Sequence, residues 1–540
     1  MNLKQIVGLA LGILGLVLPW LIDLPGLNFA GQVTLGIFLM AGCFWVTEPV
    51  PIYTTSLLVI FLEVLLLSRE GPLIQFGRPE TVPAQAAAVA DGAPAHLVPA
   101  ASLASGPALW VARPGELPER IAVEILDQRP DTAVVRSASI SADSLVLTDP
   151  DHWLTTYRPT PYRNFFAALA DPIIILFMGG CLLADASVKY RLDRSLTRMF
   201  LKPVGTNPSL IVLGLLVATA VLSAFMSNTA TTAMMMTVVL PILAKLGPDD
   251  PARRAVVLAI PVGANIGGIA TPIGTPPNAI ALAAAAKQGV VIPFATWTLM
   301  ALPLVVVSLL LAWVLLVRLY RPAARAVHLD LTGEFDRSAK AIGLYVVFGI
   351  TALLWFTENQ HGIPSSMVAF LPVVALPMFG IVGKQEIRGL PWDVLWLMAG
   401  GISLGTAIRD TGLAQWMVAQ VNWGALGGFA IVVGLALFSF ALANFLSHTV
   451  TVTLLAPIAI SVGAATGVAA DFQLGTALVA VAVASSYGMS LPISTPPNAI
   501  AMSSGMIETR DMLKVGLLLG GLGMVLVLGM TRYFWPLFFN

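Results

Sequence analysis

The decapeptide PIGTPPNAIA, from Pro272 to Ala281, returns as PISTPPNAIA from Pro492 to Ala501, with nine identical positions and a spacing of 220 residues. Both copies lie inside long apolar runs, where proline removes an N–H donor and breaks a helix. In a bilayer such a break is tolerated only where protein or a watery cavity satisfies the freed backbone groups. Paired breaks in the two halves of a membrane protein indicate a transport site; the competing interpretation is a pair of helix kinks that bind no ligand.

A second pair of strings has the same spacing, because Ser227-Asn228-Thr229 corresponds to Ser447-His448-Thr449. These strings lie in the middle of two further apolar stretches, 208–246 and 427–463. Each stretch is long enough for two membrane crossings or for one hairpin that enters the bilayer and returns. The sequence alone leaves both alternatives open.

The composition is that of a polytopic membrane protein. Of the 540 residues, 57% are hydrophobic and 11% are charged, whereas about 25% are charged in a soluble domain. The net charge of zero argues against nucleic-acid binding. Cys43 and Cys181 lie in apolar runs, and the five histidines lack ligand spacing, so neither a disulfide framework nor a metal enzyme is predicted. Residues 3–22 resemble a signal sequence without a small-residue cleavage site, which predicts an uncleaved first span.

Eleven apolar runs have the length of membrane spans. They cover 5–22, 30–47, 51–67, 165–188, 252–287, 295–318, 340–357, 364–381, 392–409, 473–505 and 512–535. Besides the first span, each half of the chain has five spans outside its polar tip stretch, and an odd number means that the halves cross the membrane in opposite senses. The predicted fold is therefore an all-α polytopic membrane protein built as an inverted repeat.

Weaker matches between the halves reveal an insertion. Trp45–Glu48 resembles Trp355–Glu358 at a spacing of 310 residues, whereas Gly179-Gly180 matches Gly400-Gly401 at a spacing of 221. The difference, 89 residues, measures a segment present only in the first half. Composition locates this segment at 69–163, where Pro, Ala, Asp and Arg replace the apolar residues.

Short alternating pieces within the insertion predict strands, and hence a small extramembrane module that contains β-structure. The pieces are Ile121–Leu126, Thr132–Ser137 and Ser144–Thr148.

Lysine and arginine residues set the orientation. If the N-terminus is cytoplasmic, the inner loops hold eighteen of them, and the outer loops hold three besides the eight arginines of the insertion. Long segments are translocated regardless of charge, so the eight count little. The prediction is a cytoplasmic N-terminus, with the C-terminus and the insertion outside.

Acidic residues at the span ends have structural explanations. Glu48 and Glu358 occupy equivalent span ends, and Asp171 and Asp393 lie where helix N-caps are expected. Glu63, near the outer end of its span, is expected to reach the surface.

The two polar tips offer hydroxyls, an amide and unpaired backbone groups between helix ends. Helix N-termini suit a carboxylate or sulfate, whereas C-terminal carbonyls and hydroxyl oxygens suit a hard cation such as Na⁺. The competing interpretation is that the polar residues are ordinary helix caps. No nucleophile–base or metal cluster lies near the tips, which argues against an enzyme. A channel fits paired broken helices less well than alternating access does.

The two tips, the two Thr-Pro-Pro-Asn breaks and the stretch Thr47–Pro51 together resemble the divalent anion:sodium symporter family, over the whole chain except residues 69–163. The resemblance implies eleven spans plus two re-entrant hairpins, a homodimer, and a transport domain that moves against a scaffold as an elevator. It implies di- or tricarboxylates or sulfate as substrates. The implied domains are scaffold segments 1–68, 164–205 and 321–412, the insertion 69–163, and two halves of the transport domain, 206–320 and 413–540.

The resemblance also assigns a site, position by position. The first Na⁺ site would use Ser223, Ser227, Asn228 and the carbonyl of Gly274. The anion would contact Ser227, Asn228, Thr229, Ser447, Thr449, Thr495 and Pro496, with His448 as a further candidate. The second Na⁺ site would use the tip near Ser447 and the carbonyl near Ser494.

The second half departs from the family's pattern. Ala443 and His448 stand at the positions of Ser223 and Asn228, so a hydroxyl and an amide oxygen are missing there, and Asn444 is the candidate to compensate. A neutral imidazole is a poor Na⁺ ligand, and a protonated one repels the ion. Three roles stay open for His448: a neutral hydrogen-bonding tip residue, a substrate ligand, and a proton-coupling group in place of Na⁺.

These observations predict a secondary transporter of the cell (inner) membrane that moves a small dianion with Na⁺ as the coupling ion. A C4-dicarboxylate is the expected substrate. The alternatives are a Na⁺-independent or proton-linked anion exchanger of the same fold, and sulfate as the substrate.

Overall fold

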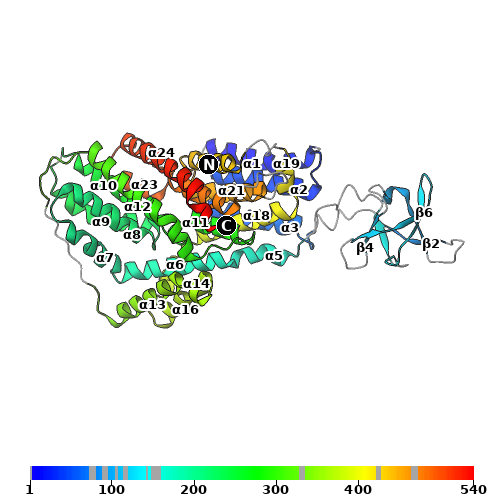
Figure 1. The fold of residues 1–540 in the computed structure, drawn as a ribbon, viewed down its shortest axis with the longest axis horizontal. Helices are drawn as coiled ribbons and strands as arrows, with labels where there is room; N and C mark the ends of the chain where they lie inside the picture. The colour runs from blue at the N-terminus through cyan, green and yellow to red at the C-terminus, as the bar shows by residue number, and fades with distance from the viewer. Residues whose placement is uncertain are drawn as a thin grey trace. The chain divides into compact units, whose positions relative to one another are not determined.

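The chain is mostly helical in the computed structural model (Figure 1). The structure describes residues 3–22, 24–71, 81–87, 95–103, 108–112, 119–140, 144–147, 160–247, 249–327, 335–420, 427–463 and 472–539. The chain forms two compact units. One comprises 1–49, 58–166 and 406–417, and the other comprises 50–57, 167–405 and 418–540.

The helices follow the apolar runs of the sequence closely. In chain order they are α1 Leu3–Leu21, α2 Phe29–Thr47, α3 Ile52–Leu67, α5 Tyr162–Ala167, α6 Pro172–Lys189, α7 Leu192–Leu201, α8 Pro208–Ser223, α9 Asn228–Ala244, α10 Ala252–Gly268, α11 Pro276–Ala286, α12 Phe294–Leu319, α13 Ala339–Phe356, α14 Glu358–His361, α15 Ser365–Val368, α16 Phe370–Met378, α17 Lys384–Arg388, α18 Trp392–Asp410, α19 Leu413–Ala419, α20 Gly428–Ala443, α21 His448–Gly463, α22 Leu474–Ser486, α23 Pro496–Ser503 and α24 Thr509–Tyr533. Short 3₁₀ turns cover Ala100–Leu103, Ala168–Ala170, Lys202–Val204 and Trp535–Phe538.

Six helical segments within the described ranges are long and apolar enough to cross a membrane. They are Leu3–Leu21, Phe29–Thr47, Tyr162–Lys189, Phe294–Leu319, Ala339–Phe356 and Thr509–Tyr533. The runs predicted at 252–287 and 473–505 are each two shorter helices, α10 and α11, then α22 and α23. The chain is therefore a multi-pass membrane protein in which the proline motifs coincide with helix breaks.

In the first unit, α1 and α2 pack against each other as an antiparallel pair. Glycine allows the close approach, since a Cβ at Gly12 would lie 2.2 Å from the ring of Phe44. Asn28 caps α2, because its Oδ1 accepts from Gly31 N at 2.7 Å. Glu63 of α3 is fully buried in the structure, so the expectation that it reaches the surface is wrong.

The insertion folds as two four-stranded antiparallel sheets around one apolar core. Its strands are β1 Thr81–Pro83, β2 Gln85–Ala87, β3 Ala95–Pro99, β4 Ala108–Ala112, β5 Glu119–Ala122, β6 Glu124–Gln128, β7 Thr132–Arg136 and β8 Leu145–Leu147. The orders are β1-β8-β4-β5 and β2-β3-β7-β6. The predicted β-module is thus confirmed, although the piece expected as one strand, Ile121–Leu126, is two. The chain passes from one sheet to the other at Val123, whose side chain is buried.

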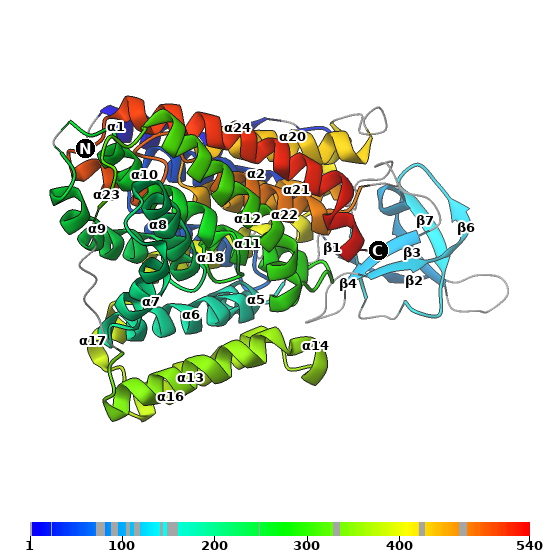
Figure 2. The same ribbon diagram turned by 60° about the vertical axis from the view of Figure 1, so that its left-hand side comes forward.

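Two helical hairpins lie in the second unit, α8 with α9 and α20 with α21 (Figure 2). They contain the polar strings at their turns, 224–227 and 444–447. Their helices have 16 or 17 residues. At 1.5 Å per residue such a helix is about 25 Å long, which is shorter than the ~30 Å hydrocarbon core of a bilayer.

Each broken helix packs against the hairpin and the helix of the other half. The C-terminal piece α11 lies against α21 and α22, and α23 lies against α9 and α10. The equivalent glycines Gly179 and Gly400 also each pack against a residue of the other half. A Cβ at Gly179 would lie 2.4 Å from the carbonyl oxygen of Ala369, and one at Gly400 would lie 2.5 Å from the Cβ of Ser56. The two halves therefore interlock rather than forming separate bodies.

Candidate functional site

The first hairpin tip is built from a helix end, a four-residue turn and a helix start. Ser223 ends α8 and Asn228 begins α9. Ser227 is the N-cap of α9, and its Oγ accepts from Ala230 N at 3.4 Å. Ser447 caps α21 in the same way, with Val450 N at 3.2 Å. The capping interpretation of both serines is therefore correct, and a cap hydroxyl still has its own proton to donate.

Polar atoms from three segments converge on the side chain of Asn228. Its inward amide atom lies 3.1 Å from the carbonyl oxygen of Gly274, 3.3 Å from that of Ala264 and 2.5 Å from Ser223 Oγ. Ser223 Oγ also lies 2.9 Å from the Ala264 oxygen. Ser223 is fully buried, and a Cβ at Gly268 would approach the Asn228 amide to 2.6 Å, so the packing around the cluster is tight.

This cluster has the chemistry of a site for a hard cation. With the amide nitrogen inward, Asn228 donates to the two carbonyls. With the amide oxygen inward, four oxygens face one another: one amide, one hydroxyl and two carbonyls. Such an all-oxygen set suits Na⁺ and does not suit a transition metal. Three of the four predicted ligands of the first Na⁺ site lie in this cluster, together with Ala264, which the sequence analysis missed. Ser227 lies on the exposed side of the tip.

The loop after α10 is held by the asparagine of the duplicated motif. Asn278 Nδ2 donates to the carbonyl of Gly268 at 2.9 Å and to that of Thr271 at 2.8 Å. Trp297 Nε1 donates to Ile269 O at 3.0 Å. These bonds satisfy carbonyls that the end of α10 leaves without helical partners. Asn278 thus supports the loop that presents the Gly274 carbonyl.

The second loop has a similar arrangement, in which the bond to Leu491 lies 220 residues after its counterpart at Thr271. Asn498 Nδ2 donates to Met489 O at 2.9 Å and to Leu491 O at 3.0 Å. Ser494 is buried, and its hydroxyl donates to Leu491 O at 2.7 Å. The side chain of Ser494 is therefore engaged within the loop, and its carbonyl remains as the candidate cation ligand.

The second hairpin tip differs from the first where the sequences differ. The Nε2 atom of His448 lies 3.0 Å from the carbonyl oxygen of Gly488, and the residue is buried. A Cβ at Gly488 would lie 2.5 Å from the Cβ of Ala443. The methyl group of Ala443 therefore packs closely against Gly488, at the position where the first half has the hydroxyl of Ser223. Asn444 does not supply a free oxygen, because its Oδ1 accepts from Ser490 N at 3.1 Å. This tip has fewer oxygens for a cation.

The candidate ligands differ in exposure, and several belong to both the anion set and the cation set. Ser227, Thr229 and Pro496 are exposed, and Asn228, Ser447 and Thr449 are half-buried. Ser223, Gly274 and Ser494 are buried. His448 and Thr495 are the buried members of the anion set.

The starts of the two broken-helix pieces offer fewer N–H donors than expected. Pro276 and Pro277 occupy the first two helical positions of α11, and the same pair begins α23. Proline has no N–H, so these termini cannot bind an anion through their first two backbone groups. The hairpin helices α9 and α21 begin with Asn228-Thr229 and His448-Thr449, which retain theirs. Of these four helix starts, the two in the hairpins therefore keep the backbone N–H groups that α11 and α23 lack at their first two positions.

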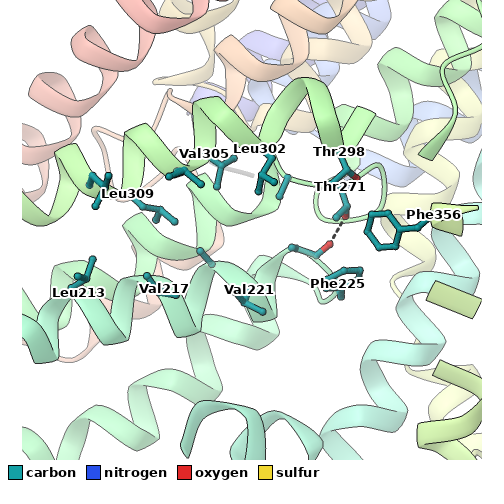
Figure 3. Close-up of a pocket in the computed structure, with 15 residues that line it drawn as sticks. Leu213, Val217, Val221, Phe225, Thr271, Thr298, Leu302, Val305, Leu309 and Phe356 are labelled. Carbon is teal, nitrogen blue, oxygen red and sulfur yellow. Dashed lines mark hydrogen bonds between the residues drawn. The ribbon is translucent and has the colours of Figure 1, made fainter. Parts of the chain in front are cut away.

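An apolar cavity of about 310 Å³ lies between α8 and α12, beside the first tip (Figure 3). Leu213, Val217, Leu302 and Leu309 line it, and Phe225 and Phe356 lie at the end nearest the tip. There the hydroxyl of Thr271 donates to Ala224 O, drawn as a dashed line in Figure 3. A dianion buried here would lose its hydration without compensation, so this cavity is not the anion site.

Comparisons with known proteins show which family and which transporters the chain is similar to. Residues 154–540 match the family described as the sodium:sulfate symporter transmembrane region. A protein named uncharacterized transporter from Haemophilus influenzae is 31% identical over 395 residues, which cover 69% of this chain and 83% of that protein. The sodium-dependent dicarboxylate transporter SdcS of Staphylococcus saprophyticus is 29% identical over 445 residues, covering 75% and 83%. The crystal structure of the Alcanivorax borkumensis YdaH transporter aligns with a TM-score of 0.48 at 14% identity, covering 74% of this chain and 94% of that one.

The matched family and the relatives are transporters that couple sodium to an anion, so this multi-pass chain is a Na⁺-coupled transporter of a small anion and not an enzyme. The chain belongs to the divalent anion:sodium symporter family.

Proposed function

We propose that this protein is a Na⁺:C4-dicarboxylate symporter of the cell membrane. The observation that carries the proposal is the oxygen cluster formed by Ser223, Asn228, Ala264 and Gly274. Its contents match the oxygen preference of Na⁺, and it adjoins a tip whose exposed hydroxyls suit an anion.

The substrate class follows from the polar groups and from the relatives. Ser227, Thr229, Ser447 and Thr449 offer hydroxyls, and the starts of α9 and α21 offer N–H groups and positive helix ends. Two such tips would suit the two carboxylates of a C4-dicarboxylate, with Thr495 and Pro496 beside them. The sodium-dependent dicarboxylate transporters among the relatives support this choice. Sulfate, in the description of the family, is the second candidate substrate.

Na⁺ would bind at one strong site, the cluster around Asn228. When bound, the ion would hold the Asn228 amide oxygen inward and join α8 to the loop of Gly274. The second site, between the tip at Ser447 and the carbonyl of Ser494, would bind Na⁺ weakly. At this tip the imidazole of His448, which replaces an amide, faces the carbonyl oxygen of Gly488.

Transport would proceed by an elevator motion of the two interlocked halves. The proposed architecture has eleven spans in an inverted repeat, two re-entrant hairpins, a homodimer, a cytoplasmic N-terminus and an outer C-terminus. The interlocked packing of α11 and α23, and hairpin helices too short to span a bilayer, support it. The implied scaffold and transport segments remain those predicted from the sequence.

A Na⁺-independent or proton-linked exchanger is the competing function, because His448 stands where the first half has an amide. Counterflow in proteoliposomes separates these possibilities. Labelled succinate, malate, citrate and sulfate would be offered with Na⁺ and with K⁺, at several pH values. We expect succinate and malate uptake that requires Na⁺, and its loss in Asn228→Ala. Equal uptake in K⁺, or uptake driven by a pH gradient alone, would refute Na⁺ symport.

A further inference from the structure

One buried amide joins the two halves of the molecule at the site. Asn265 lies in the last turn of α10 and is 1% exposed. Its Nδ2 lies 3.4 Å from Thr495 Oγ1 and 3.3 Å from Asn498 Oδ1. Both acceptors belong to the loop and the first turn of α23, in the second half of the chain. Asn265 therefore bridges a helix of one half to the broken helix of the other.

The other end of this connection is the cation cluster. Ala264 precedes Asn265 in the same helical turn, and its carbonyl oxygen lies 2.9 Å from Ser223 Oγ. A helix turn is stiff, because each carbonyl is fixed by the hydrogen bonds of its neighbours. A small displacement of the Ala264 carbonyl toward a cation would therefore carry the Asn265 amide with it, and with the amide its two partners in the second half.

Thr495 is placed to pass such a displacement to the anion. It is the N-cap of α23, and its Oγ1 accepts from Asn498 N at 3.3 Å. Its neighbour Pro496 is exposed, so this cap lies just beneath the surface of the broken helix. Asn265 thus contacts the cap residue, and both Thr495 and its exposed neighbour Pro496 belong to the proposed anion contacts.

The equivalent residue of the second half makes no such bridge. Ser485 lies 220 residues after Asn265 and is also fully buried, but its hydroxyl donates to Ala482 O of its own helix at 2.7 Å. The fold therefore accommodates a small residue at this position.

The stability of the fold does not explain why residue 265 is an asparagine. Asn265 Oδ1 is buried without a hydrogen-bond partner in the described part of the chain. An unpaired buried polar atom destabilises the folded state, because its lost hydration is not replaced. A residue selected only for packing would avoid that cost, as Ser485 does.

We propose that Asn265 is a positioning residue that couples cation binding at the Ser223–Asn228 cluster to anion binding at Thr495. This inference rests on the proposed function. Coupling between two sites is reciprocal, so Na⁺ raises the affinity for the anion by the same factor by which the anion raises the affinity for Na⁺. Asn265 contributes to this factor rather than to either intrinsic affinity.

The test measures four dissociation constants on the purified full-length protein. Calorimetry would give the Kd of succinate without Na⁺ and at saturating Na⁺, and the Kd of Na⁺ without succinate and at saturating succinate. The variants are Asn265→Ser, which copies the second half, and Asn265→Ala. Ser485→Ala is the matched control. Thermal melting would establish that each variant is folded.

We expect the coupling factor to fall about tenfold in both Asn265 variants, since the hydrogen bonds to Thr495 and Asn498 are lost. The Kd of Na⁺ without succinate should change less than the coupling factor, and the control should resemble the unmodified protein. An unchanged coupling factor, or equal weakening of all four constants, would overturn the inference while leaving the proposed function intact. An unmodified protein that binds succinate equally with and without Na⁺ would overturn the proposed function as well.

Discussion

Removing one hydroxyl, in Ser223→Ala, tests the cation cluster most directly. Ser223 Oγ lies 2.5 Å from the Asn228 amide and 2.9 Å from Ala264 O, and the side chain is fully buried. It is one of the four oxygens that would face Na⁺. The second half has alanine at the equivalent position, Ala443, so the backbone tolerates the change.

The expected size of the effect follows from this burial. A hydrogen bond or contact to a charged group contributes about 1.5–3 kcal/mol, and the small cavity left by the hydroxyl is lined by other buried atoms. Since about 1.4 kcal/mol corresponds to a tenfold change, the Na⁺ concentration for half-maximal succinate uptake should rise about ten- to a hundredfold. At saturating Na⁺ the maximal rate should be retained.

The assay is succinate uptake into proteoliposomes at graded Na⁺, with ionic strength held constant by choline. The thermal stability of the variant in detergent without Na⁺ serves as the control for folding. A half-maximal Na⁺ concentration within twofold of the unmodified protein would refute the assignment of this cluster. So would a loss of uptake that saturating Na⁺ does not restore in a folded variant.

Three further outcomes are expected. The double change Ala443→Ser with His448→Asn restores the oxygens of the second tip, so the Na⁺ dependence of uptake should become steeper; an unchanged Hill slope would count against a weakened second site. Replacing residues 72–159 of the insertion by a short flexible linker should leave succinate affinity unchanged, because the insertion has no counterpart among the duplicated motifs; weaker binding by a folded product would contradict this. Lys189 Nζ lies 2.6 Å from Glu386 Oε1, and this contact, helped by Gly383 N, lowers the pKa of Glu386 to about 2. The stability that this pair provides should be complete above the usual pKa of a glutamate and lost as the pH falls toward 2, so the difference in melting temperature between the unmodified protein and Glu386→Gln should shrink from pH 6 to pH 3; a constant difference would show that the pair is unimportant.

Most helices and both helix breaks could be predicted from the sequence, because hydrophobic length and proline chemistry act locally. The caps could be predicted for the same reason: Asp171 accepts from Ile173 N at 3.0 Å. Glu358 also has the structural role expected, since its carboxylate accepts from Phe294 N and Ser365 N. Each of these features depends on a residue and its near neighbours, or on a duplicated motif that marks both partners.

Features that depend on long-range packing could not be predicted in this way. The place of Ala264 in the oxygen cluster comes from a backbone carbonyl, which no residue type reveals. The bridge from Asn265 to Thr495 joins positions 230 residues apart that are not equivalent in the repeat. The burial of Glu63 and the division of one predicted strand at Val123 likewise depend on which faces meet after folding. One signal was available for Asn265: it is a polar residue in an apolar run whose repeat partner is a different, smaller residue.

Three differences between the two halves each remove an amide or a hydroxyl from the second half. At three equivalent pairs the first half has Ser223, Asn228 and Asn265, and the second half has Ala443, His448 and Ser485. Each exchange removes an amide, or a hydroxyl directed at the cation cluster, and the backbone arrangement around the loops is kept by Asn278 and Asn498. Under the proposed function, a duplicated scaffold would support one strong cation site connected to the anion. In the other tip, the imidazole of His448 contacts the carbonyl oxygen of Gly488 instead. If both halves bound Na⁺ equally, there would be no reason for these exchanges to fall together around a single cluster.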